Sequence, residues 1–245
     1  MTLSELLKII EGVAKANELS TPFICGGTPR DKILHNVTFI PDVDITTGNK
    51  DIIILGKKVA EVLGDICKYI ELPENHAIIM IKKFKIDLST NYINPAIVNK
   101  NTSNLLKETY SRDFTCNSLL MSMDLKTIFD PTKRGIKDIK DKMIRTCLPV
   151  EISLGLEPIL HKRIVRIIYL AAKLGFDVDP KIIHWVKNNP EKIANCNKQY
   201  LSGKLAQAFE FDKDRTLSLL DEMAIWKYVP ASPELRPYMT SYGRI

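Results

Sequence analysis

The sequence predicts a mixed α/β domain with a twisted sheet, followed by a smaller domain that is entirely helical. Up to about residue 148, helical and strand-like patterns alternate, whereas from Pro149 onward only helical spacing of apolar residues remains. The chain has 245 residues, of which 45% are apolar, so it is long enough to bury a core and to divide into two domains. We therefore expect domains at 1–148 and 149–228 and a Pro-rich, irregular tail at 229–245.

The predicted order in the first domain is α-β-α-β-α-β-β. Apolar residues recur at helical spacing over 3–18 and 51–64. A third helix is expected after Gly26-Gly27, with Thr28 as its N-cap and Pro29 in its first turn. Short apolar or alternating runs predict strands at 23–25, 42–45, 78–83 and 84–89.

The remaining elements follow from composition and spacing. Residues 91–104 are rich in Asn, Ser, Thr and Pro and predict a loop. A helix is expected at 114–123 and a turn and strand near 126–130. Beyond Pro149 we expect helices at 156–175, 180–187, 200–209 and 212–224.

Composition narrows the class of protein. The net charge of +6 fits a polyanionic partner and fits an ordinary basic protein equally well. No apolar run reaches roughly the 18 residues that a membrane helix needs, and the N-terminus does not resemble a signal peptide. We expect a cytoplasmic protein without a membrane partner. The five cysteines form no Cys-x-x-Cys pair, so we expect buried thiols instead of disulfides or a zinc site.

Three aspartates are candidates for a metal site. Asp42 and Asp44 are two residues apart on a predicted strand, so both carboxylates lie on one face. Asp87 lies on a strand that can pair beside the first. Carboxylates favour Mg²⁺, and two ions about 3.5–4 Å apart stabilise the attacking and leaving oxygens of an in-line phosphoryl displacement. A single Asp-x-Asp is more often a solvated strand edge, so the interpretation depends on its neighbours.

A glycine turn precedes the Asp-x-Asp pair in the sequence and supports its interpretation as a phosphate-binding site. Gly26 and Gly27 lead from a strand into a helix, which presents backbone N–H groups and the positive helix end to an anion. Arg30 and Lys32 add positive charge. Most such turns are only tight turns, but here the turn precedes the Asp-x-Asp strand.

These residues resemble a known family. Cys25–Asp31 followed by Pro41–Ile45 is similar to the first motif of class II tRNA nucleotidyltransferases and bacterial poly(A) polymerases, within the DNA polymerase β-like superfamily. Arg112–Ser118 is similar to the second motif, RRDFTxNA, with Ser111 replacing its first Arg. Residues 129–145 follow the third motif.

The resemblance implies roles for these residues. Residues 1–148 would form the nucleotidyltransferase catalytic head and 149–228 a helical neck that binds nucleotide and RNA. Asp42 and Asp44 would hold two Mg²⁺ ions, and Asp87 would help to hold the ion that activates the RNA 3′-hydroxyl. The triphosphate and ribose would be bound by Gly26, Gly27, Arg30, Arg112, Asp113 and Asn117. For Asp113, a helix cap or an ion pair with Arg112 is the alternative.

The fourth motif departs from the family pattern. Arg163 and Arg166 match its arginines, and we expect them to face base or phosphate, with a solvated basic stripe as the alternative. Ile159 and Leu160 stand where the motif has Glu and the base-reading Asp. Without that acceptor we expect looser nucleotide selection, unless Glu157 replaces it from a shifted helix.

The function implied is template-independent transfer of nucleotides from ATP and CTP to an RNA 3′ end, with tRNA as the acceptor and CCA addition as the product. The alternatives are poly(A) addition, transfer to a protein or small molecule, and a non-catalytic RNA-binding relative. Family members usually continue into further helical regions that hold tRNA. We therefore expect a partner or a second copy of the chain to extend the grip on RNA.

Overall fold

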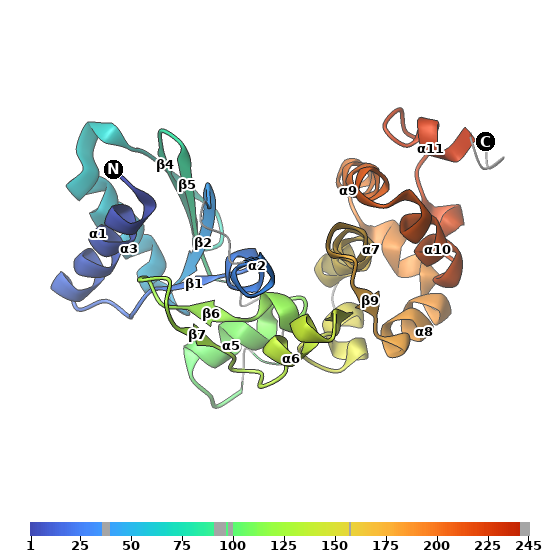
Figure 1. Ribbon diagram of the computed structural model, residues 1–245, viewed down its shortest axis with the longest axis horizontal. Helices are drawn as coiled ribbons and strands as arrows, with labels where there is room; N and C mark the ends of the chain where they lie inside the picture. The colour runs from blue at the N-terminus through green and yellow to red at the C-terminus, as the bar shows by residue number, and fades with distance from the viewer. Residues whose placement is uncertain (36–39, 91–96, 98–99, 157, 241–245) are drawn as a thin grey trace. The chain divides into compact units, whose positions relative to one another are not determined.

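The structure, a computed structural model, describes residues 1–35, 40–90, 97, 100–156 and 158–240 (Figure 1). It divides into two compact units, Met1–Ile139 and Lys140–Ile245. The domain boundary expected after residue 148 falls inside the second unit. Each unit has its own set of packed elements and is described separately.

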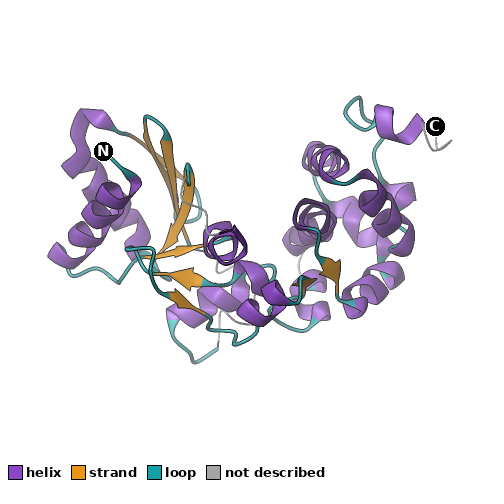
Figure 2. Ribbon diagram, viewed as in Figure 1, coloured by secondary structure: helices purple, strands orange, loops and turns teal. Residues whose placement is uncertain are grey.

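The first unit is built on a mixed sheet, which has seven strands among the described residues, in the order β3-β4-β5-β2-β1-β6-β7 (Figure 2). Strands β2 and β5 run parallel, and the other neighbouring strands are antiparallel. The strands are β1 (Phe23–Cys25), β2 (Asp42–Thr46), β3 (Lys68–Leu72), β4 (His76–Ile81), β5 (Phe84–Ser89), β6 (Leu120–Met121) and β7 (Ile128–Phe129).

Helices α1 (Leu3–Ala16) and α3 (Asp51–Leu63) lie together on one side of this sheet (Figure 1). Their buried residues recur at helical spacing and join the strands in one apolar core, to which each fully buried Leu or Ile contributes about 1.5–3 kcal/mol. A capping box formed by Thr2 and Glu5 begins α1. Core residues include Leu6, Ile10, Ile24, Ile45, Leu55, Val59, Ile79 and Ile86.

Alternation along β2 and β5 places their polar residues on the other face. Val43 and Ile45 belong to the core, so Asp42 and Asp44 point away from α1 and α3. On β5, Ile86 and Leu88 belong to the core, so Asp87 between them also points away from α1 and α3. Three shorter helices complete the described part of this unit: α2 (Gly27–His35), α5 (Asn104–Ser111) and α6 (Gly135–Lys140).

The elements predicted up to residue 89 are confirmed, with β3 as an addition. The helix predicted at 114–123 is wrong: a 3₁₀ turn at Thr115–Asn117 leads into β6. The helix lies earlier, at α5, which Ser103 caps. The apolar residues of 114–123 also suit a helix, but Leu120 and Met121 form strand β6, which pairs with β1 and β7. This tertiary pairing overrides the local helical preference. Within the predicted loop at 91–104, residues 91–96 and 98–99 lie outside the described residues.

The second unit is mainly helical. The helix predicted at 156–175 begins only at Lys162, after a π turn (Glu151–Gly155) and a 3₁₀ turn (Pro158–His161). Val178 pairs with Ile144 in a short parallel ladder that the helical pattern did not predict. The tail expected to be irregular contains a short helix, α11. The helices are α7 (Lys162–Leu174), α8 (Pro180–Asn188), α9 (Lys198–Phe211), α10 (Lys213–Glu222) and α11 (Arg236–Thr240).

Two expectations from composition can be compared with the structure. Four of the cysteines are buried thiols, as predicted, whereas Cys67 is partly exposed. None of the helices in the described part of the chain combines the length and apolar character that crossing a bilayer requires.

A buried contact joins the second and third sequence motifs. Thr115 Oγ1 donates to Asp138 Oδ2 over 2.6 Å. Gly135, at the start of α6, lies so close that an added Cβ would be 2.6 Å from the Thr115 carbonyl oxygen. Replacing this glycine would therefore force the backbone apart.

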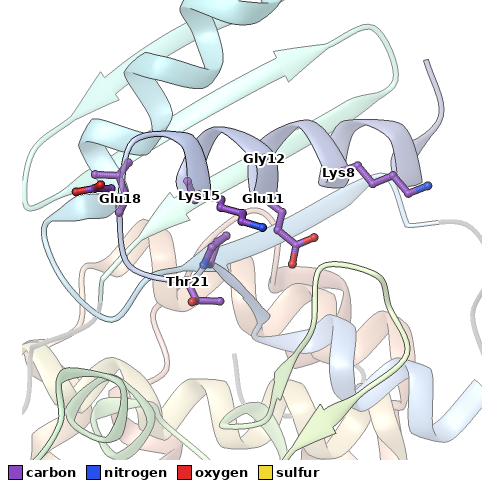
Figure 3. A pocket seen from close by; sticks show the side chains of 9 residues that line it. Lys8, Glu11, Gly12, Lys15, Glu18 and Thr21 are labelled. Carbon is purple, nitrogen blue, oxygen red and sulfur yellow. The ribbon is translucent and has the colours of Figure 1, made fainter.

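We predict that Gly135→Ala lowers the free energy of unfolding by about 1–3 kcal/mol through overpacking. The matched control is Gly12→Ala on α1, where a Cβ meets no atom within 4 Å (Figure 3). That control should gain roughly 0.5–1 kcal/mol from helix propensity. Urea unfolding of both variants measures the difference, and equal stability would contradict the predicted clash.

Candidate functional site

The three predicted aspartates come together on adjacent parallel strands. Asp44 of β2 is directly opposite Asp87 of β5, and Asp42 is opposite Lys85. Because side chains alternate along a strand, all four lie on the face turned away from α1 and α3. The sheet therefore brings three carboxylates and one ammonium to one place.

Asp42 and Asp44 are the more accessible carboxylates. Neither side chain has a hydrogen bond or ion pair with another described residue. Although solvent reaches Asp44, the surrounding protein desolvates it and raises its pKa; Arg112 opposes this shift, and Asp87 and Asp42 add to it. A cation beside Asp44 would offset the free-energy cost of keeping this desolvated carboxylate ionised.

Asp87 is held differently. Its Oδ1 is 2.9 Å from His76 Nε2, and its Oδ2 pairs with the Lys85 ammonium. The hydrogen bond from Lys85 to Asp87 raises the lysine pKa. Within the described ranges, no group of three or more His, Cys, Asp and Glu side chains has the arrangement of a metal site.

Sequence reasoning missed both partners of Asp87. Lys85 was detectable, because it lies two residues before Asp87 and so shares its face of the strand. His76 was not, because its position depends on the register of the β4–β5 hairpin, in which Asp87 is opposite Ile78.

The glycine turn lies directly against Asp44. Gly26 has φ +73°, a conformation that other residues rarely adopt, and a Cβ there would clash with the Asp44 carboxylate. Helix α2 begins at Gly27, so Thr28 lies inside the helix and is not the N-cap that we expected. The turn thus brings the N-terminus of α2 to the carboxylates.

Arg30, Asp113 and Asn117 form a buried hydrogen-bond chain. Arg30, 4% exposed, donates through Nη1 to Asn117 Oδ1 at 2.5 Å and through Nε to Asp31 Oδ1 at 2.8 Å. Asn117 Nδ2 donates to Asp113 Oδ1 at 3.1 Å, and the same oxygen accepts the Phe114 N–H at 2.8 Å. Asp113 thus holds Asn117 at the end of the turn Thr115–Asn117, whose cap residue is Phe114 and not Asp113. A contact of Asp113 with nucleotide stays a prediction. Phe114 is buried in the core.

Arg112 forms a second buried pair behind Asp44. Its Nη2 donates to Glu108 Oε1 at 2.7 Å and to Cys25 Sγ at 2.8 Å, while its Nε is buried without a hydrogen-bond partner. Burial lowers the pKa of Arg112, but Cys25 and the carboxylates of Glu108 and Asp44 outweigh it and raise the pKa. Burial also raises the pKa of Cys25 to about 12.

Glu108, which is fully buried, was missed by sequence reasoning. Its position four residues before Arg112 on a helical segment was the available signal. It supplies the negative charge that this buried guanidinium requires.

The fourth-motif residues lie in the helical unit. Arg163 is 2% exposed, and its Nη1 donates to the Ser153 carbonyl at 2.9 Å, so it braces the preceding turn. Arg166 is half-buried, and Leu160 is fully buried. Glu157 lies outside the described residues, so its role stays a prediction. A carboxylate introduced at Leu160 would be buried and would carry a desolvation cost.

One groove of the first unit lies apart from these residues. A groove of about 620 Å³ runs along α1, and its wall includes Lys8, Glu11, Lys15 and Glu18 (Figure 3). It contains none of the predicted site residues. Its charges of both signs balance, which gives it no selective electrostatic character.

Comparison with known proteins identifies relatives. The mitochondrial CCA tRNA nucleotidyltransferase of Saccharomyces cerevisiae is 35% identical over 72 residues, 29% of this chain and 13% of that protein. The A-adding tRNA nucleotidyltransferase of Aquifex aeolicus is 32% identical over 164 residues, 63% of this chain and 18% of that protein. The matched segments are therefore a small part of these relatives.

Solved structures share the fold. The CCA-adding enzyme of Bacillus stearothermophilus in complex with CTP is 22% identical with a TM-score of 0.74, over 94% of this chain and 55% of that chain. A tRNA nucleotidyltransferase complexed with a primer tRNA and an ATP analogue is 25% identical with a TM-score of 0.72, over 91% and 62%. This chain therefore spans less than two thirds of either solved chain.

The family assignment comes from the sequence. The model of the poly A polymerase head domain matches residues 22–145, about half of the chain. This range contains the glycine turn, the three aspartates and the Arg30–Asn117–Asp113 chain. The protein therefore belongs to the poly A polymerase head domain family.

Proposed function

We propose that this chain is a metal-dependent RNA 3′-nucleotidyltransferase that uses ribonucleoside triphosphates and acts on tRNA. The observation that carries the proposal is the pairing of Asp44 with Asp87 on parallel strands, with Asp42 two residues earlier and the Gly26 turn against Asp44. Two accessible carboxylates beside a helix N-terminus suit the binding of a metal-bound polyphosphate.

The activities of the relatives support tRNA as the proposed acceptor and nucleoside triphosphates as the proposed substrates. The curated relatives are tRNA nucleotidyltransferases of the CCA-adding and A-adding kinds. Solved neighbours were captured with CTP, with ATP, and with a primer tRNA plus an ATP analogue. Because one relative is an A-adding enzyme, addition of A alone is the close alternative to CCA addition.

The residues fit Mg²⁺ in part. Asp42 and Asp44 offer carboxylates without protein partners, and the raised pKa of Asp44 signals a charge in need of compensation. Asp87 would join them only by exchanging Lys85 or His76 for the ion. When bound, Mg²⁺ supplies charge neutralisation and alignment for in-line displacement.

Different groups of the protein would bind different parts of the nucleotide. The N-terminus of α2 and the backbone N–H groups of the Gly26 turn would receive the triphosphate. Asn117 Oδ1 accepts from Arg30 and from Cys116 Sγ, and Nδ2 donates to Asp113, so one N–H of Nδ2 is left to contact a ribose hydroxyl. Arg30 would act mainly by holding Asn117, because its guanidinium is already paired. Arg166, which is half-buried, would contact the base or a phosphate, while Arg163 would support it by bracing the preceding turn through the Ser153 carbonyl.

The direct test combines the purified chain, Mg²⁺, each ribonucleoside triphosphate and a tRNA that lacks its 3′ CCA. Sequencing of the extended products distinguishes CCA addition, addition of A alone and unselective extension. Labelled ATP with protein or small-molecule acceptors tests the other enzyme class. Absence of any extension, with the fold intact, would refute the proposal.

We predict that Asp42→Asn and Asp44→Asn each reduce transfer about a thousandfold, because the metal contributes several kcal/mol of charge stabilisation in the transition state. Asp65→Asn is the matched control, since Asp65 is an exposed carboxylate of the same unit. Rates are measured as primer extension with Mg²⁺. Near-normal turnover by either site variant would exclude these carboxylates from the chemistry.

We predict that Asp44→Asn also stabilises the metal-free protein. The folded state raises the Asp44 pKa, so ionised Asp44 opposes folding and its cost appears as pH rises above the unfolded value of about 3.9. In EDTA near pH 7, the variant should unfold at higher urea than the wild type. The difference should vanish in acid, below the unfolded pKa. A variant less stable at neutral pH would contradict the electrostatic explanation.

We predict that the wild type prefers ATP to dATP and that Asn117→Ala weakens this preference. The variant should also lose about 1–3 kcal/mol of stability, because buried Arg30 loses an acceptor. The ratio of kcat/KM for the two nucleotides isolates the sugar contact from the stability loss. Equal use of ATP and dATP by the wild type would rule out ribose reading.

A further inference from the structure

A cluster of two aromatic rings and two lysines lies on the helical unit, and none of the proposed site residues belongs to it. Tyr169 and Lys173 come from α7, whereas Lys204 and Phe211 come from α9. The two rings meet edge to face, with centroids 5.9 Å apart and planes at 70°. We call these four residues the aromatic-lysine patch.

Helical spacing explains why the patch is at the surface. Lys162, Arg166, Tyr169 and Lys173 follow one another at intervals of four, three and four residues, so they form one stripe along α7. They are the less buried positions of the helix, whose other face carries core residues such as Ile164. The stripe contains no acidic residue and continues from Arg166, the proposed nucleotide contact.

Both lysines lie over the rings. Lys204 Nζ is 4.3 Å from the centroid of Tyr169, and Lys173 Nζ is 5.8 Å and 5.9 Å from Tyr169 and Phe211. Lys204 also donates to Gln207 at 2.9 Å. In the part of the chain that the structure describes, neither lysine forms an ion pair with a carboxylate. Two positive charges are thus kept beside aromatic surface without a compensating anion.

The surroundings leave this aromatic surface accessible. Phe211 is 52% exposed, an unusual position for a phenylalanine ring. The acidic residues nearest in sequence are Glu210 and Asp212, and Asp212 Oδ1 accepts the Arg215 N–H at the start of α10. An apolar protein partner would bury two ammonium groups without an acceptor, which is costly. A nucleic acid strand supplies both flat bases and phosphates.

We propose that the aromatic-lysine patch binds a single-stranded segment of RNA, with a base stacked on Tyr169 or Phe211 and phosphates beside Lys173 and Lys204. The choice of RNA over other polyanions rests on the proposed function. Base stacking is tolerant of sequence, so the patch would hold the strand without selecting the nucleotide.

The test measures binding of a short fluorescein-labelled oligo(A) RNA to the full chain by anisotropy, in EDTA, over a range of salt concentrations. Tyr169→Ala and Phe211→Ala should each weaken binding roughly tenfold with an unchanged salt dependence. Lys173→Ala and Lys204→Ala should each reduce the slope of log K against log salt by about 0.7.

The controls separate stacking from folding and from general charge. Tyr169→Phe keeps the ring and should bind as the wild type does. Phe129→Ala removes an exposed ring, 44% exposed, from the other unit, and Lys187→Ala removes an exposed lysine from α8. Neither control should change binding beyond twofold. A blunt RNA duplex should bind more weakly than the single strand, because its bases are already stacked.

Unchanged RNA affinity in the ring and lysine variants would overturn the proposal. So would a change of oligomeric state in those variants without loss of RNA binding, which would make the patch a contact between copies of the chain. Primer extension is measured separately. If the patch variants lose RNA binding, the RNA-binding role of the patch is supported even when the wild type transfers no nucleotide. If the wild type transfers nucleotides but the patch variants bind RNA normally, the RNA-binding role is refuted and the proposed function is not.

Discussion

The register between β2 and β5 is the constraint on which the candidate site depends. It sets Asp44 opposite Asp87, and a shift of β2 by one residue would turn Asp42 and Asp44 into the core and Val43 and Ile45 outward. Burial of Val43, Ile45, Ile86 and Leu88 against α1 and α3 prevents that shift. The apolar face of the sheet therefore determines the chemistry of the opposite face.

Behind the carboxylates, charge is balanced within the protein. Arg30 pairs with Asp31 and Asn117, and Arg112 pairs through Nη2 with Glu108 and Cys25. Removing one member of a buried pair leaves the other uncompensated, which costs several times more than losing an exposed pair. These networks are therefore best understood as a rigid support. In the first unit, the groups proposed to meet a ligand are backbone N–H groups, the exposed carboxylates and the remaining N–H of Asn117.

Local patterns predicted the part of the site that lies in one stretch of chain. The two-residue spacing of Asp42 and Asp44 and the turn at Gly26 can be read from residue type alone. The partners of Asp87 could not all be predicted, because His76 reaches it through hairpin register. The helix predicted at 114–123 failed because the apolar run that contains Leu120 serves a strand as well as a helix, and only pairing with β1 decides between them. Burial of Arg163 likewise depends on packing that spacing does not encode.

The position of β1 has a consequence for how the first unit folds. This strand has only three residues, and it pairs on one side with β2 and on the other with β6, where Ile24 meets Met121. The bonds from Arg30 to Asn117 and from Arg112 to Cys25 each span 87 residues. Contacts of such long range form slowly, because the entropy of closing the intervening loop is lost before they are gained. During synthesis, β1 and the glycine turn leave the ribosome long before their last partners, so one edge of β1 stays open until the chain has passed β6.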